Sequence, residues 1–238
     1  MVARKAISAG LIRGGGPKGG KARGRRQVSV NRLSDAQRDG AIETTGRNLY
    51  EEAEKLARKA EKNGSPLPVQ LLQEAAQTGY APAVYALANW HLHGKGVRKN
   101  YKKAAILLRQ AANARFALAA YDLAVSYELG KGLEKSARKA CHYYLQAANN
   151  GDVNGMTEVA RCMYYGIGTK KNPVKAVEWY KKAAEQGDSE AQYAVGLAYQ
   201  FGDGVEQDVL SAVHWYRKAA ERGQLEAKKA LARLEERG

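Results

Sequence analysis

The sequence contains two cysteines, five prolines and two phenylalanines in 238 residues, and these shortages exclude several classes of protein. Two cysteines are too few for a disulfide-stapled scaffold, and five prolines against 25 glycines exclude a proline-rich linker protein. No apolar run approaches the roughly eighteen residues that a membrane-spanning helix needs. The remaining composition, 45% hydrophobic and 26% charged, is that of an ordinary soluble protein.

Acidic residues are absent from the first 34 positions, which carry nine Lys or Arg and therefore +9 of the net charge of +15. This glycine-rich stretch cannot bury enough apolar surface to offset its ordering entropy, so we predict a disordered basic N-terminal tail, residues 1–47. A solvated tail, a mitochondrial targeting segment and a nucleic-acid-binding arm all remain open. We expect a cytoplasmic protein, with mitochondrial targeting as the alternative. The cations available for contact with nucleic acid or another anionic surface are Arg4, Lys5, Arg13, Lys18, Lys21, Arg23, Arg25 and Arg26.

The tail also contains a near match to a phosphate-binding loop between Gly15 and Ala22. Such a loop ends in Ser or Thr, which ligates magnesium, and it lies between a buried strand and a helix. Here the last position is Ala22, and neither flanking element is indicated. We therefore predict no nucleotide site.

The rest of the chain is organised by a repeat of thirty-six residues. A Gly-x-Gly triplet begins at Gly94, Gly130, Gly166 and Gly202, and an alanine pair begins at Ala111, Ala147, Ala183 and Ala219. These positions define four units, residues 79–114, 115–150, 151–186 and 187–222. We expect an atypical capping half-unit before them, 48–78, and a capping helix after them, 223–238.

Each unit has the pattern of a helical hairpin. Small or apolar residues at helical spacing precede the Gly-x-Gly triplet, whose first glycine supplies a positive-φ helix stop. An N-capping residue follows at the same position of every unit, namely Asn100, Ser136, Asn172 and Asp208. Large residues then alternate with the alanine pairs along a second helix. We therefore predict an all-α fold of stacked hairpins.

The fourth unit resembles the Sel1-like repeat, a relative of the tetratricopeptide repeat. Its matching segments are Ala191–Tyr199, Gly202–Val205, Asp208, Ala212, Trp215-Tyr216, Lys218–Ala220 and Gly223. The first unit departs from the pattern, with His91 in place of the usual Tyr and Leu107-Leu108 in place of Trp-Tyr. The resemblance implies a right-handed α-solenoid that acts as an adaptor for other macromolecules.

Catalytic and metal-binding motifs have structural explanations in this repeat. Ser136-x-x-Lys139 matches a β-lactamase motif, but both residues belong to repeated positions and the companion motifs are absent. Cys141 and Cys162 occupy positions filled elsewhere by small or apolar residues, which favours reduced packing thiols. The histidines lack ligand spacing. We predict no catalytic residue, no metal site, no cofactor and no enzymatic activity.

A protein or peptide partner is expected in the concave groove, which the first helix of each unit lines in helix-pair solenoids. Tyrosine and arginine commonly anchor interfaces, although these tyrosines could instead pack against the neighbouring helix. The predicted partner-binding residues are Tyr85, Asn89, Tyr121, Glu128, Thr157, Arg161, Tyr164, Tyr193 and Gln200. The alternative function is association with nucleic acid through the tail, with the solenoid as an assembly module. The oligomeric state stays open.

Overall fold

The computed structural model describes residues 35–236, and the regular elements in this part of the chain are all α-helices. They are α1 (Asp35–Asn63), α2 (Val69–Gln77), α3 (Ala81–His93), α4 (Tyr101–Asn113), α5 (Ala117–Leu129), α6 (Ala137–Asn149), α7 (Val153–Tyr165), α8 (Pro173–Glu185), α9 (Ser189–Phe201), α10 (Val209–Glu221) and α11 (Leu225–Glu235). The all-α fold predicted from the sequence is confirmed. The tail cations between Arg4 and Arg26, and the near match to a phosphate loop, lie outside the described residues.

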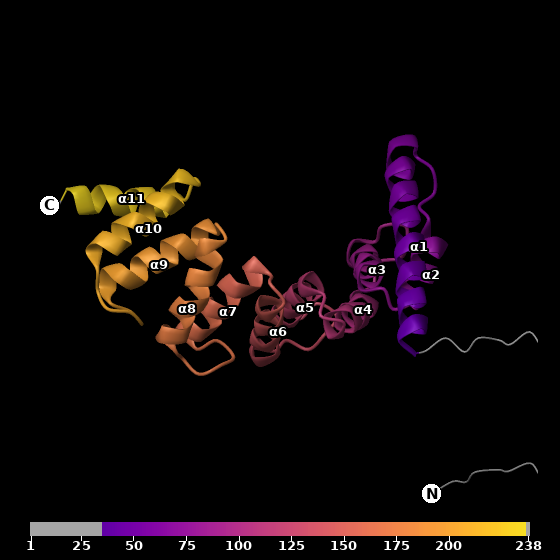
Figure 1. The fold of residues 1–238 in the computed structure, drawn as a ribbon, viewed down its shortest axis with the longest axis horizontal. Helices are drawn as coiled ribbons and strands as arrows, with labels where there is room; N and C mark the ends of the chain where they lie inside the picture. Colours follow the sequence, from indigo (N-terminus) through magenta and orange to yellow (C-terminus); the bar gives the residue numbers. More distant parts are fainter. Residues whose placement is uncertain (1–34, 237–238) are drawn as a thin grey trace, which may run out of the picture.

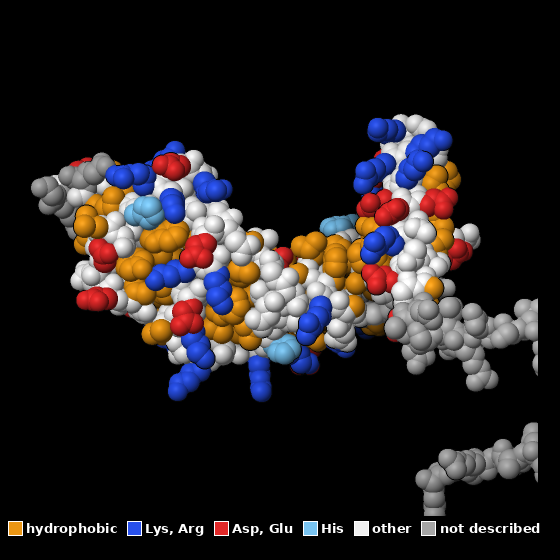
Figure 2. Space-filling view, in the orientation of Figure 1, with side chains coloured by type: hydrophobic (Ala, Val, Ile, Leu, Met, Phe, Trp, Pro, Cys, Tyr) orange, Lys and Arg blue, Asp and Glu red, His pale blue; other side chains and the backbone are white. Residues whose placement is uncertain are grey.

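Each helix packs on its neighbours along the chain, and the stacked pairs form an arch around an open hollow (Figures 1 and 2). The first helices of the four units are α3, α5, α7 and α9, and the second helices are α4, α6, α8 and α10. Each of these helices has 13 residues and starts 36 residues after the equivalent helix of the preceding unit. The spacing of the helices therefore equals the period of the sequence repeat. The first helices α5 and α7 line the inner side of the arch (Figure 1).

The helix ends follow the predicted capping chemistry. The first glycine of each triplet is left-handed, with φ between 71° and 75°, and its N–H donates to a carbonyl in the last turn of the first helix. The side chains of Asn100 and Asn172 each accept from the backbone N–H three residues later at 3.0 Å, and Ser136 Oγ does so at 3.3 Å. Asp208 Oδ1 accepts from Leu210 N at 3.0 Å. The predicted N-caps are therefore confirmed.

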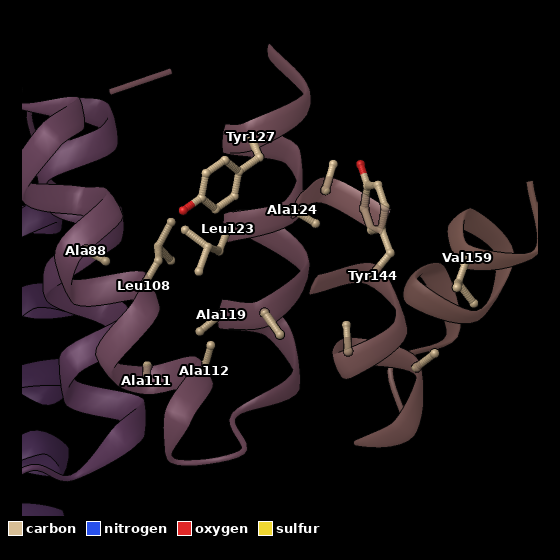
Figure 3. Packing of buried hydrophobic residues seen from close by; sticks show 14 of the residues in the cluster. Ala88, Leu108, Ala111, Ala112, Ala119, Leu123, Ala124, Tyr127, Tyr144 and Val159 are labelled. Atoms are coloured by element: carbon tan, nitrogen blue, oxygen red, sulfur yellow. The ribbon is translucent and has the colours of Figure 1, made fainter. Parts of the chain in front are cut away.

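The core consists of large side chains set against small ones. The second helices contribute Leu108, Tyr144, Tyr180 and Tyr216, which are buried. Alanine pairs beside them leave room for the next helix. In Figure 3 the side chains of Leu108, Leu123 and Tyr127 face one another between α4 and α5. Close stacking of this kind is how a hairpin that cannot bury its own face gains stability from its neighbours.

The second glycine of each triplet forms the contact between adjacent units. A Cβ atom on Gly132 would lie 2.3 Å from Tyr101 O, and one on Gly168 would lie 2.2 Å from Ala137 O. Both carbonyls belong to the first residue of the preceding unit's second helix. These glycines therefore allow a backbone-to-backbone approach that any side chain would block.

Some polar contacts between units recur only every second unit. Arg109 Nη2 donates to Tyr127 Oη at 2.8 Å, and Lys181 Nζ donates to Tyr199 Oη at 2.8 Å. Between these two interfaces the equivalent positions hold the apolar Leu145 and Met163. At the three junctions between the four units, this position is therefore polar, apolar and polar in turn.

One connection lacks its glycine. Gly79, Gly151, Gly187 and Gly223 end the helical pairs with φ between 84° and 92°, whereas the equivalent Arg115 has φ 61°. Arg115 is the only non-glycine residue with positive φ among the described residues. A side chain in this left-handed conformation costs about 1 kcal/mol.

The N-terminal end differs from the expected boundaries. α1 begins at Asp35, so residues 35–47, expected to belong to the disordered tail, are helical. Gly46 is buried in the contact between α1 and the turn before α3, where a Cβ would lie 2.1 Å from Thr78 Oγ1. Arg47 and Glu43 form an ion pair of 3.2 Å one helical turn apart. Residues 35–47 contain two glycines and two threonines, which have low helix propensity. Contact with the rest of the fold thus stabilises the helix over this segment.

Candidate concave interface

The predicted tyrosines of the groove take part in packing between helices. Tyr85 Oη donates to Asp122 Oδ2 of the next unit at 3.0 Å, and its ring centroid lies 5.1 Å from that of Phe116. Burial raises the pKa of Tyr85 to about 12, so the phenol keeps its proton and remains a donor. The rings of Tyr121 and Tyr193 lie 5.5 and 5.6 Å from the buried rings of Tyr144 and Tyr216. These tyrosines are half-buried, and each leaves part of its surface in the groove.

Thr157 replaces tyrosine at the same repeat position and is buried. Its hydroxyl donates to Val153 O and lies equally close, at 3.3 Å, to Asp188 Oδ1 at the start of α9. The side chain therefore joins two first helices and exposes little surface to a partner.

The centre of the groove holds a connected polar network. Arg161 Nη2 donates to Glu128 Oε1 at 2.8 Å, and Arg161 Nε donates to Glu158 Oε2 at 2.7 Å. Tyr144 Oη donates to the other oxygen of Glu128 at 2.6 Å. Burial by itself raises the pKa of Glu128, but these hydrogen bonds from Tyr144 and Arg161 outweigh it and hold the pKa below its usual range. Glu128 is therefore ionised and paired.

The remaining predicted residues also bridge elements. Tyr164 Oη donates to Asp203 Oδ2 in the loop of the next unit at 2.5 Å, and Gln200 Oε1 accepts from Tyr216 Oη at the same distance. Asn89 is half-buried on α3. The structure thus places all nine predicted residues on the first helices, with most of their polar groups already paired within the array.

Sequence reasoning missed a second row on the same face. Leu129, Tyr165 and Phe201 are the last residues of α5, α7 and α9, and they are 55%, 66% and 66% exposed. They follow Val125, Arg161 and Leu197 by four residues, which places both sets on one helix face. The sequence could have predicted this row, because its residues lie one helical turn after positions that already face the groove. We call Leu129, Tyr165 and Phe201 the apolar row.

A further acidic residue, Asp122, lies on α5 two helical turns before Leu129. Asp122 on α5 is half-buried, and among the described residues no Lys or Arg forms an ion pair with it. Burial raises the pKa of Asp122 above its usual value, and the charge of Asp152 adds to this effect, while the hydrogen bond from Tyr85 opposes it. The carboxylate is thus destabilised in the free protein and would gain from a cation supplied by a partner.

The described part of the chain provides little for catalysis or metal binding. Ser136 caps α6, and both cysteines are buried and free. His91 is buried, whereas His93, His142 and His214 are exposed on separate helices. Among residues 35–236, no group of three or more His, Cys, Asp or Glu side chains could hold a metal ion. No described helix has both the length and the apolar character needed to cross a membrane.

These features define the class of the protein as a solenoid of stacked helical hairpins. The Sel1 repeat model matches residues 29–65, 81–115, 117–152, 153–188 and 189–224, which together exceed half of the chain. The chain therefore belongs to the Sel1 repeat family, and the resemblance seen in the sequence is confirmed. Proteins of this family generally act as non-catalytic scaffolds for protein–protein interaction.

The first matched segment has an unusual structure. Residues 29–65 match a complete repeat, yet their described part is occupied by the single helix α1, which runs from Asp35 to Asn63. This segment contains no Gly-x-Gly triplet to end a first helix. Within the described part of this repeat, α1 therefore runs from Asp35 to Asn63 without the break that separates two helices in the other units.

Two solved structures show how the fold is related to known proteins. A protective antigen of uropathogenic Escherichia coli strains, which displays an SLR fold, is 28% identical with a TM-score of 0.72. The match covers 82% of this chain and 43% of that chain, so this chain spans less than half of the antigen. A Sel1 repeat protein from Oxalobacter formigenes is 27% identical with a TM-score of 0.62, and the match covers 84% of this chain and 78% of that chain. Comparison with curated proteins found no match.

Proposed function

We propose that this protein is a non-catalytic adaptor that binds a peptide segment of a protein partner in its concave groove. The apolar row carries the proposal, because three large side chains at one repeat position remain exposed, while the positions one helical turn earlier, Val125, Arg161 and Leu197, are half-buried. Aromatic and aliphatic side chains gathered on one face are typical of an interaction surface. The general scaffold role of the family supports the same function.

The charges of the groove suit a partner segment with both apolar and basic side chains. The apolar row would take the apolar side chains, and a Lys or Arg would pair with Asp122, whose burial makes an added cation favourable. Arg161 is already held by Glu128 and Glu158, so its role is to shape the groove rather than to select an anionic partner.

A random-peptide library panned on the protein tests this function. We expect the selected peptides to combine apolar residues with Lys or Arg. The double variant Tyr165→Ala/Phe201→Ala should bind them at least about thirtyfold more weakly, since truncating an interface aromatic costs about 2 kcal/mol or more. Asp122→Asn should weaken the binding of the basic peptides.

The matched control is Val174→Ala/Leu210→Ala, which truncates two apolar side chains that are 56% and 83% exposed on second helices. This control should keep the affinity of the selected peptides. Melting temperatures of both variants should stay close to that of the unchanged protein, because all four side chains are exposed. Equal affinity of the groove variant and the control would contradict the proposed site.

A further inference from the structure

A second surface is formed by the loop and first helical turn that follow the first helix in the first three units. We call residues 94–103, 130–139 and 166–175 the basic loop edge. It contains twelve Lys or Arg and a single acid, Glu134. All twelve cations are exposed: Lys95, Arg98, Lys99, Lys102, Lys103, Lys131, Lys135, Arg138, Lys139, Lys170, Lys171 and Lys175. The equivalent segment of the fourth unit, 202–211, contains three acids and no base.

The three segments form one continuous strip. The position of a Cβ on Gly132 lies 2.8 Å from Lys102 N, and that on Gly168 lies 2.7 Å from Arg138 N. Each basic segment therefore touches the preceding one through its glycine. Several Lys and Arg side chains project from the lower rim of the arch in Figure 2. The strip follows the solenoid from the first unit to the third.

Three of these cations occupy positions where a positive charge opposes helix stability. The first turns of α4, α6 and α8 carry no acidic residue, and their third residues are Lys103, Lys139 and Lys175. The N-terminus of a helix favours negative charge, so a lysine there is unfavourable. Within the described residues, only Lys95 of the twelve cations forms an ion pair, with Glu61. The fold leaves this charge available for an anion from outside.

A hollow of about 730 Å³ opens at the N-terminal end of the strip. Arg98, Lys99, Lys102 and Lys103 line it together with Tyr101. The Tyr101 ring is 37% exposed, and Lys99 Nζ lies 5.0 Å from its centroid. Cations along a backbone path, with an aromatic ring on which a base can stack, are the features that bind single-stranded nucleic acid.

We propose that the basic loop edge binds single-stranded nucleic acid, with phosphates along the three basic segments and a base stacked on Tyr101. A nucleic acid fits better than a membrane, because a bilayer also needs inserted apolar side chains. Besides Tyr101, the basic loop edge offers one exposed large apolar side chain, Val174 at 56%, whereas the more exposed Leu210, at 83%, lies in the acidic fourth segment. That acidic segment repels phosphates and ends the strip.

The test uses the full chain with Lys103→Glu, Lys139→Glu and Lys175→Glu combined. Each glutamate occupies the third position of a capped helix, where it favours the helix, so the melting temperature should be unchanged or higher. Binding of a fluorescein-labelled 20-nucleotide single strand, as RNA and as DNA, is measured by anisotropy. We expect affinity to fall about tenfold or more, and the slope of log K against log salt to decrease by about 2.

The matched control is Lys59→Glu, Arg217→Glu and Lys228→Glu, which changes the net charge equally at exposed positions outside the strip. Tyr101→Ala should weaken binding about fivefold or more through lost stacking. All variants keep the N-terminal tail. Equal affinity of the edge variant and the control would overturn the proposal, because the contact would then lie in the tail or elsewhere. Displacement of the strand by polyglutamate or phosphatidylserine vesicles as readily as by unlabelled strand would also overturn it.

Discussion

Arg161 on α7 reaches back to Glu128 on α5, with 2.8 Å between Nη2 and Oε1, and so joins the second and third units across the groove. Glu128 also accepts a hydrogen bond of 2.6 Å from the hydroxyl of the buried Tyr144. The ion pair is thus anchored to the core through Glu128, while both of its side chains remain about one-third exposed to solvent.

A double-mutant cycle with Arg161→Ala and Glu128→Ala should give a coupling free energy of at most about 1 kcal/mol, because both side chains are about one-third exposed. The folded pKa of Glu128 is lowered, so this stabilisation is present above the pKa of an unfolded glutamate and is lost as pH falls through the folded pKa. Urea unfolding at several pH values measures the coupling. A coupling unchanged in acid would rule out the ionic contact.

Asp122→Asn should increase stability at neutral pH. The folded pKa of Asp122 is raised, mainly by burial, so ionisation disfavours the folded state once pH rises through that pKa. Asparagine can still accept the hydrogen bond from Tyr85 without carrying charge. The gain should shrink as pH falls and the native carboxylate becomes protonated. Comparing urea midpoints of the two proteins across pH measures this effect, and a gain independent of pH would contradict the explanation.

Arg115→Gly should stabilise the protein by up to about 1 kcal/mol, because glycine adopts the φ of 61° without the steric cost of a Cβ. The control is Ala114→Gly, since Ala114 has φ −80° and glycine there only adds freedom to the unfolded chain. We expect the control to lose stability. If both substitutions destabilise equally, the left-handed Arg115 is not strained.

Gly168→Ala should destabilise the array much more than Gly151→Ala. Both glycines have positive φ, but an added Cβ meets Ala137 O at 2.2 Å in the first case and nothing within 4 Å in the second. The difference isolates the contact between units and should amount to about 1–3 kcal/mol. Chemical denaturation of the two variants gives this difference, and equal losses would show that the units can separate there without cost.

The repeat, the N-caps and the glycine stops were predictable because each rests on local chemistry that recurs at a fixed spacing. Asn100 caps its helix for reasons visible within four residues. The helical segment 35–47 was not predictable in this way, since Gly46 gains its place from contact with Thr78 and Tyr80. Arg115 occupies a position that glycine fills in the other units, and only the backbone conformation shows that the same left-handed turn forms there. The ion pair between Arg161 and Glu128 depends on how α5 and α7 lie relative to each other, which the spacing of residues in the sequence does not determine.

The alternation of Arg109–Tyr127 and Lys181–Tyr199 with the apolar Leu145 and Met163 has a consequence for the growth of such arrays. Inserting a second copy of the third unit alone, residues 151–186, would bring the charged Lys181 opposite the apolar Met163 at the new junction. Inserting two consecutive units would reproduce both kinds of junction. The central part of the array should therefore be lengthened by duplicating the second and third units together, residues 115–186, a 72-residue block that matches the distance between the recurring partners.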